Sequence, residues 1–192
     1  MKRRLLILGA VSAVAGCAGP LPDTVQLVPI TGEMPFDVPP ARIVPFLGYS
    51  PYEIHVFPEE FALYWTLPGE QARRYLVGIG QPGRYIGGTY HVGDKREWPS
   101  WTPTRAMIAR EPDLYKPYAA GMPGGPGNPL GARALYLYRS NGTDSYLRIH
   151  GTPNPRGLGQ RISNGCVRMA NSQVIDLYNE VPLGTRVVLH PL

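Results

Sequence analysis

The sequence predicts a mostly β fold of mainly antiparallel strands, with one short helix near the C-terminal end. Short runs that alternate between apolar and polar residues recur along the chain, and turns rich in proline and glycine separate them. The 192 residues include 23 glycines and 22 prolines, which favours strands, turns and long loops over a helical bundle. Only one segment, after residue 170, carries a convincing helical period.

The start of the chain has the layout of a signal peptide, at residues 1–17. A basic stretch at positions 2–4 precedes an apolar run at positions 5–15, which is too short to span a bilayer as a stable helix. The run exits through Val14-Ala15-Gly16-Cys17, which resembles the lipobox of bacterial lipoproteins, whose cysteine is acylated and becomes the new N-terminus. We therefore expect lipidation at Cys17 and a periplasmic protein that a lipid anchors to a membrane. Ala18 resembles the residue that sorts such proteins to the outer membrane.

Loss of this leader changes what the charge and cysteine counts imply. The full chain has 19 basic and 14 acidic residues, but 16 basic residues and a net charge of +2 remain once the leader is removed. The basic balance is then weak evidence for an acidic partner, and export argues against nucleic acid. With Cys17 acylated, Cys166 has no partner within the chain, so we expect no disulfide.

The remaining chain divides into a tether and one domain. Residues 18–49 contain seven prolines and few charges, and we expect an extended tether whose apolar residues around Ile43 and Phe46 lie along the domain. The domain is expected at residues 50–192, a length that suits a single core.

Within the domain, alternation and apolar runs predict strands at 53–57, 61–67, 74–79, 134–138, 146–149 and 185–189. Residues 98–103 and 119–130 are too rich in proline, glycine or tryptophan for core strands and predict a long surface loop. We expect residues 119–130, with Tyr115, Tyr118 and Met122, to form a flap that shapes a substrate site. A floppy insertion is the alternative.

One helix is expected after residue 170. Asn171 or Ser172 serves as its N-cap, and Pro182 with Gly184 ends it. Its apolar face consists of Val174, Ile175, Tyr178 and Val181.

The chemistry is expected at Cys166, because a working thiol needs a basic partner and His150 offers one. His150 ends an apolar strand. After a loop rich in proline and glycine, the chain can turn back through Ser163-Asn-Gly-Cys166 and bring the thiol close to the imidazole. The Gly151 carbonyl could fix the imidazole, and the Gly165 and Cys166 amides could donate to an oxyanion. Taken alone, each residue has a plainer interpretation: a small buried cysteine, and a histidine of the surface or core.

These residues carry a resemblance. Ile149-His-Gly-Thr152 followed by Ser163-Asn-Gly-Cys-Val-Arg-Met169 resembles the signature of the peptidoglycan L,D-transpeptidase catalytic domain, of the YkuD type and ErfK/YbiS-like. The motifs Trp98-Pro-x-Trp-x-Pro-Thr104, Asn128-Pro-Leu-Gly131, Asp176-Leu-Tyr178 and Gly184-Thr-x-Val-Val also have counterparts there, so the resemblance covers residues 50–192. It implies a β-sandwich of mainly antiparallel strands with a short helix after the cysteine.

The resemblance also implies a role for each residue of the motif. Cys166 is the expected nucleophile, His150 the proton donor and acceptor, and Gly151 the residue whose carbonyl orients the imidazole. Gly165 and Ser163 are expected to shape an oxyanion pocket with the Cys166 amide. Substrate contacts are expected from Ser163, Arg168, Asn128 and Met122. Asn164 stands where many members carry histidine and others lysine or serine, which makes His150 the only expected base.

The reaction that the resemblance implies is acyl transfer from the third residue of a peptidoglycan tetrapeptide stem to an amine, with release of D-alanine. The amine belongs to a second stem, giving a 3–3 cross-link, to a lipoprotein acceptor or to a free D-amino acid. An L,D-carboxypeptidase that uses water and a non-enzymatic wall-binding lipoprotein remain as alternatives. We expect no cofactor and no metal, because His55, His91, His150 and His190 are scattered along the chain.

Overall fold

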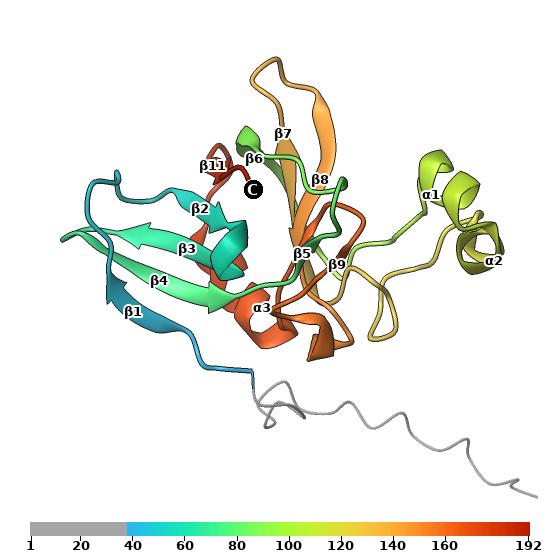
Figure 1. The fold of residues 1–192 in the computed structure, drawn as a ribbon, viewed down its shortest axis with the longest axis horizontal. Coiled ribbons are helices and arrows are strands. Elements are labelled where there is room, and N and C mark those ends of the chain that lie inside the picture. Colours follow the sequence, from blue (N-terminus) through green and yellow to red (C-terminus); the bar gives the residue numbers. More distant parts are fainter. Residues whose placement is uncertain (1–37) are drawn as a thin grey trace, which may run out of the picture. The chain divides into compact units, whose positions relative to one another are not determined.

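The computed structural model describes residues 38–192, so the predicted leader, Cys17 and most of the predicted tether lie outside the described residues. Its elements follow the chain in the order shown by the colours of Figure 1. The strands are β1 (Arg42–Pro45), β2 (Ile54–Phe57), β3 (Ala62–Leu67), β4 (Gln71–Leu76), β5 (Ile79–Gly80), β6 (Gly88–Glu97), β7 (Arg133–Tyr138), β8 (Asp144–His150), β9 (Arg161–Ser163), β10 (Val167–Arg168) and β11 (Arg186–Leu189). The helices are α1 (Arg105–Arg110), α2 (Pro112–Tyr115) and α3 (Asn171–Glu180), with 3₁₀ turns η1 (Pro58–Glu60), η2 (Lys116–Tyr118) and η3 (Pro155–Gly157).

Nine of these strands form one continuous sheet, in the order β1-β4-β3-β2-β11-β6-β7-β8-β10. Most neighbours are antiparallel, while β11 pairs with β2 and β10 pairs with β8 in parallel. A second sheet consists of β5 and β9 alone, also in parallel. In Figure 1 the β1–β4–β3–β2 part and the β6–β7–β8 part run at a steep angle to each other.

Helix α3 packs into the core that the bent sheet encloses. Val174 and Leu177 are fully buried in one hydrophobic cluster with Trp65, Leu135 and Ile149. Polar contacts tie the helix to both parts of the sheet. The Tyr75 hydroxyl on β4 donates to Asp176 Oδ2 at 2.7 Å, and Lys95 Nζ on β6 donates to the carbonyls of Tyr178 and Val181 at 2.5 and 2.6 Å. The lysine thereby satisfies carbonyls at the C-terminal end of α3.

The prediction of a mostly β fold with mainly antiparallel strands and a helix after the cysteine is confirmed. The predicted strands correspond to β2, β3, β4, β7, β8 and β11, with ends shifted by a few residues. Strand β1 falls within the range assigned to the tether, where β-branched Ile43 and Val44 pair with β4. Strand β6 was not predicted as an element, because its ten residues are polar or charged apart from a few and only Val92 is fully buried.

The predicted N-cap of the helix is wrong. Ala170 occupies the N-cap position, and neither Asn171 nor Ser172 caps the helix, since both already lie in its first turn. The Asn171 side chain is used elsewhere, because its Oδ1 accepts a hydrogen bond from the Ala132 N–H at 2.9 Å. A tertiary contact therefore takes the polar group that local rules assign to the cap.

The segment between β6 and β7 is ordered by its own contacts. Thr104 caps α1 by accepting from the Met107 N–H at 3.2 Å, and Trp101 and Met122 exchange two backbone hydrogen bonds at 2.9 and 2.7 Å. These contacts favour an ordered loop over a floppy insertion. Within residues 38–192, none of the helices is long and apolar enough to cross a bilayer.

Candidate active site

His150 lies at the C-terminal end of β8, where the sheet and a glycine fix its ring. Its backbone carbonyl accepts from the Met169 N–H at 2.8 Å, and its side chain is 3 % exposed. The ring Nδ1 lies 2.6 Å from the Gly151 carbonyl oxygen, which only accepts, so Nδ1 carries the hydrogen. Nε2 is then the basic nitrogen of the ring. This geometry agrees with the role that the sequence predicted for Gly151.

Burial sets the protonation state of His150. Burial, and then the positive charges of Arg168 and Arg148, lower the pKa of the imidazole to about 3, against opposing backbone contacts with Gly151 and Leu130. The ring is therefore neutral at physiological pH.

Gly151 has no room for a side chain. A Cβ at this position would lie 2.2 Å from Asn171 Oδ1 and 3.1 Å from the Ala132 N. The close approach of two chain segments thus explains the glycine without reference to a turn.

The turn that carries Cys166 is held by the Ser163 hydroxyl. Ser163 Oγ donates to the Cys166 carbonyl at 2.6 Å and accepts from the Gly165 N–H at 3.1 Å. Gly165 has a φ of +128°, in the region that favours glycine. The Gly165 N–H, a predicted oxyanion donor, thus donates inside its own turn in this structure. Ser163 itself is 1 % exposed and acts as a brace of the turn.

The strand register places the predicted residues on one face of the sheet. Arg168 on β10 pairs with His150 on β8, and the neighbouring pair, Val167 and Ile149, points into the core. Side chains alternate along a strand, so Arg168 shares the opposite face with His150 and with Cys166, two residues earlier in the chain. The register therefore brings together the two segments that were expected to meet.

Strand β8 is irregular where it lies next to the thiol. The pairing with β7 shifts between Tyr136 and Tyr138, and Tyr146 on β8 takes a left-handed backbone with φ +62°. The Tyr146 carbonyl oxygen lies 3.9 Å from Cys166 Sγ.

Asp144 and Arg148 brace this irregular stretch. Asp144 accepts from the Tyr146 N–H at 2.8 Å and binds the Arg148 guanidinium with both carboxylate oxygens at 2.7 Å. The guanidinium also stands 4.0 Å over the Tyr136 ring. Sequence patterns gave no signal for this pair, because its significance depends on the β8 irregularity.

The thiol is not ionised at rest. Burial raises the pKa of Cys166 above its ordinary value, with a further rise from Asp144, while Arg148 and Arg168 oppose the shift. The resting site is therefore a neutral thiol and a neutral imidazole rather than a preformed ion pair.

Asn164, which the sequence marked as a permissive position, joins the cysteine turn to the α1–α2 segment. Its Oδ1 accepts from Arg84 at 2.7 Å and from Arg110 at 2.8 Å, and its Nδ2 donates to the Tyr115 hydroxyl at 2.8 Å. Arg84 also pairs with Glu111 at 3.1 Å. The sequence did not predict a role for Arg84 or Arg110. They lie 80 and 54 residues from Asn164 in the chain, so only the fold brings them together.

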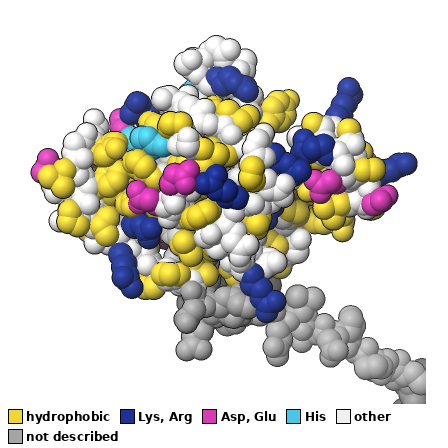
Figure 2. Space-filling view, viewed as in Figure 1, with side chains coloured by type: hydrophobic (Ala, Val, Ile, Leu, Met, Phe, Trp, Pro, Cys, Tyr) yellow, Lys and Arg dark blue, Asp and Glu magenta, His cyan; other side chains and the backbone are white. Residues whose placement is uncertain are grey.

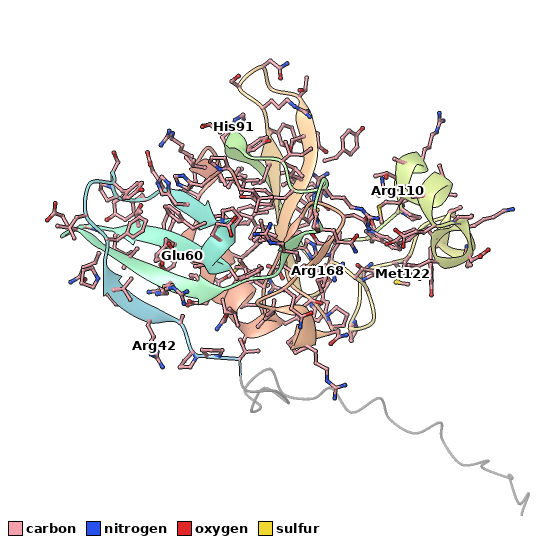
Figure 3. All side chains as sticks on the ribbon, viewed as in Figure 1. Arg42, Glu60, His91, Arg110, Met122 and Arg168 are labelled. Atoms are coloured by element: carbon pink, nitrogen blue, oxygen red, sulfur yellow. The ribbon has the colours of Figure 1, made fainter. Side chains whose placement is uncertain are left out.

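The other predicted substrate residues lie around the same segment. Asn128 is 1 % exposed, and its side chain bonds to the Met122 and Pro123 carbonyls and to the Leu130 N–H, so it holds the shape of residues 122–130. Met122 is half-buried and lies on the α1–α2 side in Figure 3. Residues 38–192 contain no group of three or more His, Cys, Asp or Glu side chains arranged to hold a metal ion.

Comparison with known proteins agrees with this geometry. The L,D-transpeptidase catalytic domain model, YkuD, matches residues 51–189. The chain belongs to this L,D-transpeptidase family. A relative named as a probable L,D-transpeptidase, YbiS of Escherichia coli (strain K12), is 40% identical over 131 residues. That match covers 67% of this chain and 41% of YbiS, so the chain spans about two fifths of this relative.

Solved structures support the fold. A Brucella melitensis protein is 44% identical and superposes with a TM-score of 0.55 over 84% of this chain and 98% of its own. That protein is described as a probable carnitine operon oxidoreductase, whereas YbiS is named as a probable L,D-transpeptidase. L,D-transpeptidase 3 from Mycobacterium tuberculosis, at 16% identity, has a TM-score of 0.53 over 72% of this chain and 60% of its own, which shows a shared fold alone.

Proposed function

We propose that this chain is a peptidoglycan L,D-transpeptidase that works by cysteine acyl transfer. Cys166 is the nucleophile and His150 the base that takes its proton. The observation that carries the proposal is the 2.6 Å contact between His150 Nδ1 and the Gly151 carbonyl, because it leaves Nε2 as a basic nitrogen on the face that holds Cys166. The family supports the reaction type.

The first half of the reaction forms a thioester. His150 Nε2 accepts the thiol proton as Sγ bonds to the carbonyl carbon between the third residue of a tetrapeptide stem, a diamino acid, and its terminal D-alanine. The Cys166 N–H donates to the oxyanion that forms. The carbon–nitrogen bond then breaks, the proton on Nε2 passes to the leaving amine, and D-alanine departs.

The second half returns the thiol. An amine attacks the thioester, its nitrogen bonds to the acyl carbon, the Sγ–carbon bond breaks and a proton returns to sulfur through His150. We assign the acceptor to an amine of a second stem, a lipoprotein lysine or a free D-amino acid. Water in the same position would give an L,D-carboxypeptidase, and the products separate the two reactions.

The remaining roles follow from the contacts. Ser163 and Gly165 hold the shape of the cysteine turn, and we assign a substrate contact to Arg168, which pairs with His150. We assign one wall of the site to Met122 and to the loop whose shape Asn128 supports.

The location is part of the proposal. A signal peptide at residues 1–17 and lipidation of Cys17 would anchor the domain in the periplasm, next to peptidoglycan. The mass of the N-terminal peptide from purified membranes tests this: acyl groups on Cys17 support it, and an unmodified Met1 contradicts it.

Release of D-alanine from a disaccharide tetrapeptide tests the activity. The wild type is expected to release D-alanine, and Cys166→Ala to reduce the rate by about a thousandfold or more. Ser140→Ala, on an exposed hairpin, is the matched control and should retain the wild-type rate. Adding an amine acceptor and weighing the products distinguishes transfer from hydrolysis. Release that persists in Cys166→Ala contradicts the proposal.

A further inference from the structure

Arg168 lies beside the thiol with its backbone fixed on two sides. β10 pairs with β8 in parallel, so Arg168 stands next to His150. On the other side Arg168 and Gly78 exchange two backbone hydrogen bonds, at 2.7 and 2.9 Å. The start of the side chain is therefore positioned as firmly as the strand itself.

The Arg168 guanidinium lacks a carboxylate partner among residues 38–192. Its Nε is buried and donates to none of the described residues. Burial lowers the pKa of Arg168, and the groups that raise it, the Cys166 thiol and the Tyr115 phenol, include no carboxylate. Its neighbours differ, because Arg148 is bound by Asp144 and Arg84 by Glu111. A half-buried guanidinium with an orphaned donor is costly unless a ligand completes it.

Further positive charge is gathered next to Arg168. The Arg84 and Arg110 guanidiniums both donate to one oxygen, Asn164 Oδ1, and Asn164 also holds the Tyr115 hydroxyl. Three arginines thus surround the turn that carries Cys166, and Glu111 pairs with only one of them. Figure 2 shows basic side chains between the strands and the α1–α2 segment, and Figure 3 labels Arg168 and Arg110 on the two sides of this region.

We infer that Arg168, with Arg84, Arg110 and Tyr115 arranged by Asn164, forms a binding site for a free carboxylate next to Cys166. A guanidinium binds a carboxylate through two parallel hydrogen bonds, and Arg168 has donors to spare. This inference rests on the proposed function for its substrate. There the carboxylate is that of the terminal D-alanine, one carbon from the scissile nitrogen. The site then selects donor stems in which the residue after the scissile bond is the last one and carries a free carboxylate.

Alkylation of Cys166 by iodoacetate and by iodoacetamide tests the site without any transpeptidase substrate. Each reagent forms an Sγ–carbon bond and releases iodide, but only iodoacetate carries a carboxylate. Peptide masses report the rate at Cys166 separately from that at Cys17. We expect the iodoacetate-to-iodoacetamide rate ratio to be about tenfold higher in the folded chain than in the same chain in urea.

Variants locate the effect. Arg168→Gln should bring the ratio to within about twofold of the value in urea, and Arg168→Lys should keep an intermediate ratio because it keeps the charge without the fork of donors. Asn164→Ala should lower the ratio in part. The matched control is Arg161→Gln. It removes an arginine of β9 that pairs with Glu59, and it should retain the wild-type ratio.

A protection experiment needs no variant. N-acetyl-D-alanine should slow the reaction of wild-type Cys166 with iodoacetamide, and N-acetyl-D-alaninamide should not. Equal ratios in the folded and unfolded chain would overturn the inference, as would an Arg168→Gln variant that slows both reagents by the same factor. If the iodoacetate-to-iodoacetamide rate ratio is the same in the folded chain and in urea while D-alanine release still depends on Cys166, the carboxylate site is refuted and the proposed function stands. If the ratio is raised as expected but D-alanine release does not depend on Cys166, the proposed function is refuted and the carboxylate site stands.

Discussion

At the scale of residues, the site holds a thiol whose pKa is raised above its ordinary value by burial. The opposing charges around Cys166 come from one strand and its neighbour. Asp144 raises the pKa of the thiol, while Arg148 and Arg168 lower it. Other titratable groups also lie around the cysteine turn, namely His150, Tyr115, Arg84, Arg110 and Glu111. Since Asp144 and Arg148 bind each other, the pair holds the β8 backbone and also sets the field at the sulfur.

The charges of this pair predict shifts of opposite sign. Arg148→Gln should raise the pKa of Cys166, so alkylation by iodoacetamide reaches half its maximal rate at a higher pH than in the wild type. Asp144→Asn, which keeps an oxygen acceptor for the Tyr146 N–H, should lower it. The measurement is the alkylation rate at Cys166 against pH. Shifts in the same direction would mean that the pair acts only through the fold.

Gly151 allows a separate test of how the imidazole is held. Gly151→Ala places a Cβ against Asn171 Oδ1 and the Ala132 N, so we expect a loss of about 1–3 kcal/mol in the free energy of unfolding, together with slower D-alanine release. Urea unfolding measures the first and product analysis the second. Gly127→Ala is the control, because no atom lies within 4 Å of the point where its Cβ would stand and its stability should change little. Wild-type stability in Gly151→Ala would contradict the close approach.

At the scale of elements, the turn between β9 and β10 connects the thiol with two separate parts of the molecule. Ser163 holds the turn from within, and Asn164 ties it to α1, α2 and Arg84. The shape of the site therefore depends on a segment between β6 and β7 that lies far earlier in the sequence.

Ser163→Ala tests the inner support. The substitution removes an acceptor for the Gly165 N–H and a donor to the Cys166 carbonyl, both in a buried position. We expect destabilisation by about 1–3 kcal/mol and a reduced rate of thioester formation. Ser140→Ala on the exposed hairpin should change neither quantity. A Ser163→Ala variant with wild-type stability and rate would show that the hydroxyl does not support the turn.

At the scale of the whole molecule, buried neutral histidines predict sensitivity to acid. Burial lowers the pKa of His150 to about 3, and burial also lowers the pKa values of His55 and His190, whose rings contact each other at 3.2 Å. The unfolded chain binds protons at these residues below pH about 6.5. The folded chain binds the His150 proton only near pH 3. The stability that these groups contribute is thus complete above about 6.5 and is lost as the pH falls.

The free energy of unfolding, measured with urea at several pH values, should therefore decrease between about pH 6.5 and 4. For the His150 proton its slope should be up to about 1.4 kcal/mol per pH unit, and His55 and His190 act in the same direction. His150→Asn keeps a donor for the Gly151 carbonyl but does not titrate, so its slope should be smaller than that of the wild type. Equal slopes would contradict a buried, neutral His150.

Sequence patterns predicted those parts of the fold that local rules control. Strands such as β2 and β8 alternate or carry apolar runs, and Cys166 and His150 stand in a motif with a chemical reason for each residue. Strand β6 was missed because its residues are mostly polar and its neighbours β11 and β7 hold it. Helices α1 and α2 bury none of their residues, so no apolar period marks them.

The same distinction applies to the site. The motif predicted the position of Arg168, but it did not predict that its guanidinium lacks a carboxylate partner among residues 38–192. Arg84, Arg110 and Arg148 could not be selected from the sequence, because the chain has many arginines and only the register and the β8 irregularity bring these to the cysteine. The sequence marked Asn164 as permissive because other family members carry different residues there. Its contacts with Arg84, Arg110 and Tyr115 were not predicted.

The most direct test of the central claim is the mass of the whole protein after mixing with a disaccharide tetrapeptide in the absence of an amine acceptor. We predict an adduct of the acyl donor minus D-alanine, one D-alanine released per adduct, and a modified peptide that contains Cys166. His150→Asn should form this adduct far more slowly than the wild type, and Cys166→Ala should not form it. An adduct on another residue, or D-alanine release without any need for Cys166, would contradict the account.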